Sequence, residues 1–156
     1  MASPPQTRIR LPDLGWRGRW RAPRRRWLEV PGHVLRQGRV LLPARRVPLG
    51  EVASLRFVPG SQTLSLAVDA GRGEVVVELL RLTQFRELTR TPTELEALAD
   101  GLAPAPVADG EVAVAALRAQ ARHLATEHSG GPMVSPMAPY VGQERASWME
   151  LGNLLP

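Results

Sequence analysis

The stretch Thr63-Leu64-Ser65-Leu66-Ala67-Val68-Asp69 gives the clearest strand signal in the chain. Leu64, Leu66 and Val68 alternate with polar residues, as they do in a strand with one buried and one wet face. This stretch belongs to a series of short apolar segments between residues 26 and 82, each bounded by turn residues. Such a series is typical of an antiparallel meander.

The neighbouring segments on both sides of residues 63–69 continue the meander. A strand over residues 51–58 is expected before Pro59-Gly60, and another from Glu74 to about Leu82 after the loop Asp69–Gly73. Glu74 and Glu78 then fall on the wet face of that last strand. Gly71-Arg72-Gly73 is interpreted as a hairpin turn, because no helix follows it to complete a phosphate-binding loop.

An earlier hairpin is expected over residues 27–42. Strand segments at 27–30, 34–35 and 40–42 surround Arg36-Gln37-Gly38-Arg39, where Gly38 could supply the positive φ of a tight turn. A short segment at 45–49 follows it.

Two helices are predicted in the second half of the chain. Thr91-Pro92-Thr93-Glu94 combines an N-cap threonine, a proline at the first helical position and a glutamate that reaches back to the cap. Gly101 is expected to help end this helix. The second helix is expected to be capped by Asp109 and to end at residues 129–132. The apolar stripes of the two helices are Leu95, Leu98, Ala99 and Leu102, and then Val114, Leu117, Ala121 and Leu124.

The order of these elements predicts an α+β protein: a small antiparallel β-barrel or half-barrel closed by a C-terminal helix, with a second helix and irregular arms outside. We expect a basic Arg/Trp-rich arm over residues 1–24 and the barrel with its capping helix over residues 25–103. The second helix occupies residues 104–129. A Pro/Met-rich tail covers residues 130–156.

The basic hairpin at 34–42, the entry Arg45-Arg46-Val47-Pro48-Leu49-Gly50-Glu51-Val52, the meander and the capped helix follow one another from Trp27 to Leu102. In this order of elements, the segment resembles the bacterial members of the pleckstrin-homology-like (PH-like) domains. The resemblance covers about half of the chain. It implies a platform that binds a protein, a peptide or an anionic lipid without catalysis, and it transfers no ligand-binding residues.

The distribution of charge is uneven. All twenty cationic side chains are arginines, and twelve of them lie in the first fifty residues with only two acidic residues, a net charge of +10. The remaining residues carry a net charge of −5. Coding by a GC-rich bacterial genome accounts for the absence of lysine but not for this asymmetry. A basic surface that contacts something acidic or anionic is therefore expected.

Arginine binds carboxylates and phosphates in a bidentate manner, and tryptophan offers a flat stacking surface, so segment 16–27 is the best candidate for binding. Alternatively, Trp20 and Trp27 pack into the barrel and the arginines are only solvated. The expected partner-binding residues are Trp16, Arg17, Arg19, Trp20, Arg21, Arg24, Arg25, Arg26, Arg45 and Arg46.

The sequence nominates no catalytic residues, no metal ligands and no cofactor. His123 and His128 are five residues apart and do not share a helix face, whereas a metal site favours a spacing of four. The serines at 54, 61 and 65 lack the glycines of a nucleophile elbow. The absence of cysteine excludes disulfides and thiolate sites.

These observations predict a non-enzymatic binding or scaffold module that contacts an acidic protein partner. The alternatives are a nucleic-acid-binding protein, with the same arginines on phosphates, and a small enzyme of unknown activity; a membrane surface is less favoured. The tail, with Met133, Met137, Tyr140, Trp148 and Met149, could pack on the domain or mediate contact with a partner or second subunit. No signal peptide is recognised, so a cytoplasmic location is expected.

Overall fold

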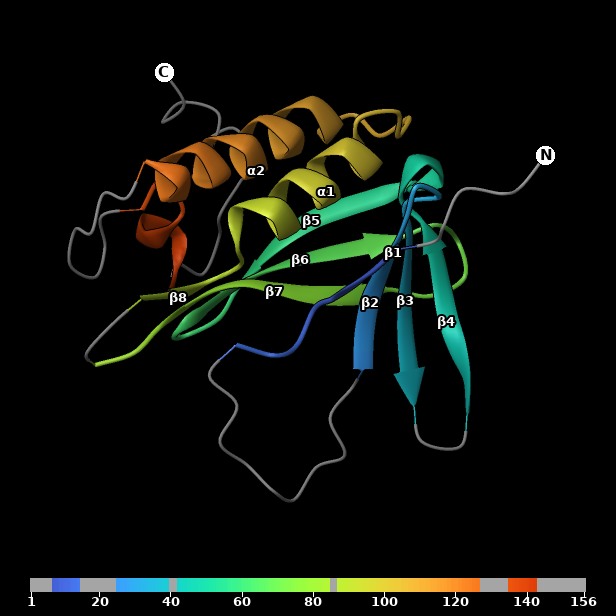
Figure 1. Ribbon diagram of the computed structural model, residues 1–156, viewed down its shortest axis with the longest axis horizontal. Coiled ribbons are helices and arrows are strands. Elements are labelled where there is room, and N and C mark those ends of the chain that lie inside the picture. Colours follow the sequence, from blue (N-terminus) through green and yellow to red (C-terminus); the bar gives the residue numbers. More distant parts are fainter. Residues whose placement is uncertain (1–6, 15–24, 40–41, 85–86, 127–134, 143–156) are drawn as a thin grey trace.

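The computed structural model of the protein describes residues 7–14, 25–39, 42–84, 87–126 and 135–142. These residues form an α+β fold with two four-stranded antiparallel sheets and two α-helices (Figure 1). The α+β class expected from the sequence is thus confirmed. Pairing between the described strands does not connect the two sheets, so the described residues form no closed barrel.

The first sheet is held together by a buried row of aliphatic side chains. Its strands are β1 (Thr7–Arg10), β2 (Arg25–Val30), β3 (Val34–Arg39) and β4 (Leu42–Pro48), in that order. Leu28, Leu35 and Val47 lie opposite one another on neighbouring strands, and all three are buried. This row defines the inner face of the sheet, because successive side chains of a strand point to opposite faces.

Two parts of the first sheet differ from the sequence expectation. The sequence predicts an irregular arm over residues 1–24, but β1 within it pairs with β2 and the Leu11 side chain is fully buried. Strand β1 has only four residues and Pro12 follows shortly after it, so the alternation of buried and exposed residues is too short to be recognised in the sequence. Gly38 was assigned to a tight turn, but it lies within β3 opposite Arg25.

The second sheet contains the strand predicted at residues 63–69. A short 3-10 segment, η1 (Leu49–Glu51), leads to β5 (Ser54–Pro59), β6 (Thr63–Asp69), β7 (Val75–Leu82) and β8 (Glu87–Thr89). The predicted strand at 63–69 and the end of the next strand near Leu82 are confirmed. Glu78 lies opposite Ser65, on the expected face of β7, but it is buried rather than wet. Its carboxylate accepts from Leu14 N at 3.3 Å and from Arg81 Nε at 2.6 Å, so the chain after β1 covers this side of the strand.

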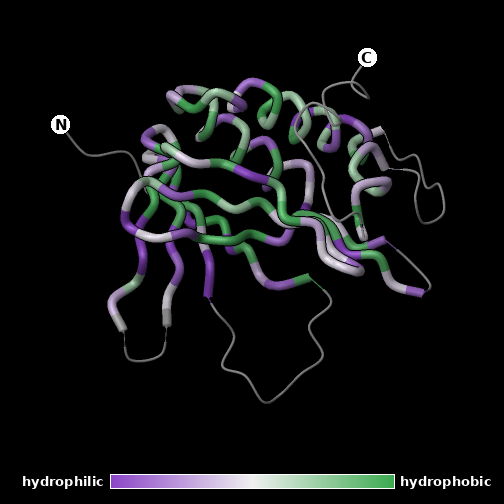
Figure 2. Tube along the Cα trace, turned by 180° about the vertical axis from the view of Figure 1, so that it is seen from behind, coloured by the Kyte–Doolittle hydropathy of each residue, from purple (hydrophilic) through white to green (hydrophobic). Residues whose placement is uncertain are grey.

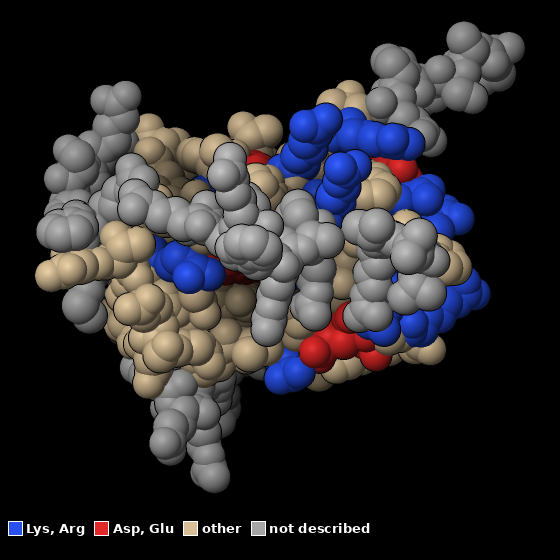
Figure 3. All heavy atoms as spheres, turned by 90° about the horizontal axis from the view of Figure 1, so that it is seen from below, with Lys and Arg blue, Asp and Glu red and all other residues tan. Residues whose placement is uncertain are grey.

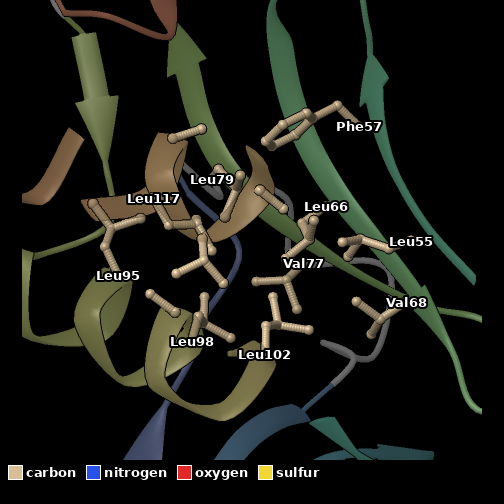
Figure 4. Packing of buried hydrophobic residues seen from close by; sticks show 14 of the residues in the cluster. Leu55, Phe57, Leu66, Val68, Val77, Leu79, Leu95, Leu98, Leu102 and Leu117 are labelled. Carbon is tan, nitrogen blue, oxygen red and sulfur yellow. The ribbon is translucent and has the colours of Figure 1, made fainter. Parts of the chain in front are cut away.

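The two helices lie together over the second sheet (Figure 1). The predicted start of α1 (Pro92–Leu102) is confirmed, since the Thr91 hydroxyl accepts from Glu94 N at 3.2 Å and the Glu94 carboxylate accepts from Thr91 N at 2.8 Å. Leu95, Leu98 and Leu102 face the buried side chains of the sheet, as Figure 4 shows. Helix α2 (Gly110–Ala125) packs on α1, but the Asp109 side chain makes no cap bond.

Gly101 lies inside α1 and allows a close approach between elements rather than ending the helix. A Cβ added there would lie 2.7 Å from Leu49 Cδ1, 3.1 Å from Leu49 Cβ and 3.0 Å from His33 Cβ. The last two atoms are close to the backbone and cannot move aside by a change of rotamer.

We therefore expect Gly101→Ala to lower the free energy of unfolding by about 1–2 kcal/mol, although alanine favours a helix, because overpacking outweighs the gain in propensity. Chemical denaturation measures this change. Gly32→Ala is the matched control, since its added Cβ would make an ordinary contact of 3.8 Å with Val34 Cγ2. Equal stability of the two variants would contradict the packing role of Gly101.

The described part of the tail packs against the body of the protein. Met137 and Tyr140 are buried beside and within η2 (Ala138–Tyr140). Met137 N donates to Gln120 Oε1 at 3.3 Å, and Gly142 N donates to Gly60 O at 2.8 Å. Self-packing thus holds for residues 135–142, while Met133, Trp148 and Met149 lie outside the described residues.

Hydrophobic residues are concentrated where the sheets meet the helices. Figure 2 shows this concentration, and it also shows hydrophilic residues at the ends of strands that project away from the helices. The projecting strands are β2, β3 and β4 of the first sheet (Figure 1).

Candidate binding surface on the N-terminal sheet

One row of side chains crosses all four strands of the first sheet on its outer face. Arg10 lies opposite Trp27, Trp27 opposite Arg36, and Arg36 opposite Arg46. Since neighbouring strands are about 4.8 Å apart, the row spans about 14 Å. Successive side chains of a strand point to opposite faces, and Leu28 is buried on the inner face, so this row lies on the outer face of the sheet.

Further arginines lie on the same face, two residues along the strands from this row. Arg8 and Glu29 lie opposite each other on β1 and β2, and Arg25 precedes Trp27 by two residues. Figure 3 shows arginines gathering over the part of the molecule that carries β2–β4, with few acidic side chains among them. We call this surface the arginine face, and it consists of Arg8, Arg10, Arg25, Trp27, Glu29, Arg36 and Arg46.

Glu29 is the one carboxylate among the residues of the arginine face, and it binds three of its neighbours. Its side chain is only 8% exposed, and it accepts from Arg36 Nε at 2.8 Å and from Trp27 Nε1 at 3.5 Å, with Arg8 Nε at 3.5 Å. Burial alone would raise the pKa of the Glu29 carboxyl. The hydrogen bonds and charges of these neighbours outweigh burial and hold this pKa below its ordinary value of 4.5.

The lowered pKa of Glu29 predicts part of the acid sensitivity of the fold. Its stabilising contribution is fully present above pH 4.5 and is lost as the pH falls through the folded-state value, because the unfolded chain then binds more protons. We expect Glu29→Gln to have a shallower loss of stability below pH 4.5 than the wild-type chain. Urea denaturation from pH 3 to pH 7 measures this difference, and parallel curves would count against it.

Three arginines of the face have no acidic partner among the described residues. Arg8 and Arg36 share Glu29, whereas Arg10, Arg25 and Arg46 form no ion pair within the described ranges. Arg46 also lies directly opposite Arg36, and like charges at opposed positions destabilise a sheet. The fold therefore keeps an excess of positive charge although the repulsion destabilises the sheet, which is typical of a surface that binds an anionic group.

Trp27 lies in the middle of the arginine face as a half-buried aromatic ring. The ring lies over Gly38 of the neighbouring strand, where an added Cβ would come within 3.3 Å of Trp27 Cζ3. The missing side chain of Gly38 thus leaves room for the ring against the sheet. Trp27 is not packed in the interior, which was the alternative considered from the sequence.

The structure brings together only part of the set expected from the sequence. Arg25 and Arg46 lie on the arginine face, as described above. Arg45 points to the other side of the sheet, where its Nη1 donates to Glu74 O at 3.0 Å next to Gly73. The remaining expected residues other than Arg26 lie outside the described residues: Trp16, Arg17, Arg19, Trp20, Arg21 and Arg24.

Arg26 departs from the expectation that it belongs to an exposed basic surface. It follows Arg25 in β2, so its side chain points to the inner face, where it is only 7% exposed and forms an ion pair with Asp13. Its guanidinium is therefore neutralised within the protein. Arg26 takes part in the fold and not in the arginine face.

Arg26 belongs to a buried polar cluster that fixes residues 11–14 between the two sheets. The Arg90 side chain is 1% exposed, and it donates to Glu78 O at 2.7 Å and to Pro12 O. Burial lowers the pKa of the Arg90 guanidinium, while the nearby Glu94 and Glu78 carboxylates raise it. This cluster holds the chain just after β1 and so helps to position the arginine face.

Five residues of the arginine face are absent from the set expected from the sequence, although Trp27 ends the candidate segment 16–27: Arg8, Arg10, Trp27, Glu29 and Arg36. The sequence does contain a strand signal at two of these places. In Arg8-Ile9-Arg10 and in Trp27-Leu28-Glu29, an aliphatic residue stands between two polar or aromatic residues, as in a strand with one buried face. The missing information was the register that aligns these short strands.

No family model, curated protein or solved structure matches the chain. Within the described ranges, no three histidine or acidic side chains come together as a possible metal site. None of the described helices is long and apolar enough to cross a membrane.

Proposed function

We propose that the protein is a non-enzymatic binding or scaffold module whose arginine face contacts an acidic surface of a protein partner. The observation that carries the proposal is the position of Arg10, Arg25 and Arg46 around Trp27 without acidic partners among the described residues. Arginine and tryptophan are enriched at the energetic centres of protein interfaces. The PH-like resemblance, the half-barrel geometry and a cytoplasmic location are parts of this proposal.

The composition of the face favours a protein over a nucleic acid as its partner. Glu29 lies within the face and already pairs with Arg8 and Arg36, which leaves fewer of its arginines for a phosphate backbone. The exposed side also contains the half-buried apolar residues Val34 and Pro48 next to the arginines. A mixed surface of this kind fits the polar rim and apolar centre of a protein interface.

Comparison of two charge-matched variants tests the proposal. In the first, Arg10, Arg36 and Arg46 are replaced by Gln; in the second, the exposed Arg56, Arg72 and Arg122 are replaced instead. The wild-type chain and both variants are tagged and isolated from their own cells. We expect an acidic protein that the wild type and the second variant retain and that the first variant loses. Equal retention by both variants would reject the arginine face as its site.

A single-stranded nucleic acid is the second candidate, because Trp27 presents an aromatic ring among arginines and bases stack on such rings. Fluorescence anisotropy with a labelled oligonucleotide tests it. Affinity should fall with salt at a log–log slope of about −0.7 per phosphate contacted by a single strand. Absence of binding at about 50 mM salt would exclude this candidate, since phosphate contacts are strongest at low ionic strength.

A further inference from the structure

The free edge of β1 offers unpaired backbone groups next to two exposed arginines. Leu11 N donates to Arg26 O at 2.9 Å, which continues the ladder between β1 and β2. Because hydrogen-bonded positions alternate in an antiparallel pair, Thr7 and Ile9 point their backbone groups toward β2. The N–H and C=O groups of Arg8 and Arg10 therefore point away from the sheet, and they have no backbone partner among the described residues.

The side chains along this edge differ between the two faces of the sheet. Arg8 and Arg10 are exposed on the outer face, whereas Ile9 on the inner face is partly buried against the core. An added strand would place every second side chain beside these arginines and the intervening ones beside Ile9. Opposite charges at facing positions stabilise a pair of strands, and like charges destabilise it.

We propose that the partner binds by strand addition, with an extended segment of alternating acidic and β-branched residues pairing with the free edge of β1. This proposal rests on the proposed function and specifies how the acidic partner is recognised. Backbone hydrogen bonds to Arg8 and Arg10 align the segment, and its carboxylates meet the two guanidiniums. A second copy of this chain is disfavoured at this edge, because it would bring arginine against arginine.

The opposite edge of the first sheet is less suited to strand addition. Strand β4 contains Pro43 and ends at Pro48, and proline has no N–H to donate to an added strand. Leu49 N already donates to His33 O at 3.0 Å, so Pro48 falls at a position whose backbone groups point outward. The edge of β1 carries no proline.

Two synthetic peptides of equal composition test the proposal on the full chain. One alternates Glu and Val over eight residues, and the other has four Glu followed by four Val. We expect the alternating peptide to bind at least ten-fold more tightly by fluorescence anisotropy. Arg10→Pro should weaken this binding at least five-fold beyond Arg10→Ala, because both variants lose the charge and only Arg10→Pro loses the outward N–H. Circular dichroism and thermal unfolding establish that both variants fold.

Amide hydrogen exchange of the wild-type chain gives a second readout that needs no variant. In the free chain, Arg8 and Arg10 should exchange faster than Ile9 and Leu11, and saturating alternating peptide should slow Arg8 and Arg10. Equal affinity for both peptides with unchanged exchange at Arg8 and Arg10 would overturn strand addition but leave acidic recognition by the face intact. Absence of binding to either peptide would also overturn it. Slowed exchange that depends on protein concentration without peptide would instead assign the edge to a second copy of the chain.

Discussion

Arg90→Met is expected to lower the free energy of unfolding by about 3–5 kcal/mol, because it leaves buried polar groups without their charged partner. Arg90 donates to carbonyl oxygens of Glu78 in the second sheet and Pro12 in the chain after β1. Methionine can fill part of the volume but donates no hydrogen bond. Both carbonyls then lose their bond to the guanidinium, and one of the links between the second sheet and the chain after β1 is removed. Chemical denaturation followed by circular dichroism measures the loss.

Two further variants make this prediction specific to the position. Arg72→Met removes an exposed guanidinium from the loop between β6 and β7, and its effect should stay within about 0.5 kcal/mol of zero. Arg90→Lys keeps the positive charge but not the geometry that reaches both carbonyls, so its loss should be intermediate. If Arg90→Met proved as stable as Arg72→Met, the cluster would have no role in holding the two sheets together.

Trp27→Ala is expected to weaken binding of the isolated protein partner by about 2–4 kcal/mol, or about 30- to 1,000-fold in Kd. Trp27 lies between Arg10 and Arg36 in the middle of the arginine face, where an aromatic ring can be fully covered by a partner. Because the ring is on the outer face and only half-buried, the fold should lose only about 1–2 kcal/mol of stability. Isothermal titration calorimetry measures the affinity.

Gly38→Ala tests the same prediction without removing the tryptophan. Its added Cβ would lie 3.3 Å from Trp27 Cζ3, so the ring must shift by a few tenths of an ångström from its position over Gly38. Binding should weaken, but less than with Trp27→Ala, and Trp27→Phe should fall between the wild type and Trp27→Ala. Unchanged affinity in Trp27→Ala would mean that the partner does not cover the ring.

The parts of the fold that could be predicted depend on signals carried within a few residues. The capping box at Thr91 and Glu94 forms as expected. The two residues are only three positions apart, so their hydrogen bonds need no tertiary contact. The alternation of Leu64, Leu66 and Val68 likewise identifies a strand with one buried face.

Features set by contacts distant in sequence were not predictable in the same way. The burial of Glu78 follows from its contact with Leu14 N, 64 residues earlier in the chain, and no local pattern reveals such a contact. Gly101 was interpreted as ending the helix, because its contacts with Leu49 and His33 come from other elements. Gly38 was likewise interpreted as part of a tight turn, because its contact with the Trp27 ring comes from another strand.

The candidate surface illustrates the same limit. The excess of arginine in the first half of the chain indicated a basic surface, but consecutive residues of a strand point to opposite faces. Arg25 and Arg26 were therefore grouped in the sequence, although one is exposed on the arginine face and the other is paired with Asp13 inside. Arg10 and Arg36 come together with Trp27 only through strand pairing.

The central claim is that a partner covers the guanidinium groups of the arginine face, and selective chemical modification of arginine measures this directly. The free protein and the complex isolated from its own cells are treated with phenylglyoxal, and modification at each arginine is followed by mass spectrometry. We predict that Arg10 and Arg46 react more slowly in the complex, while the exposed Arg72 and Arg122 react equally in both. Unchanged reactivity at Arg10 and Arg46, or protection confined to Arg72 and Arg122, would contradict the account.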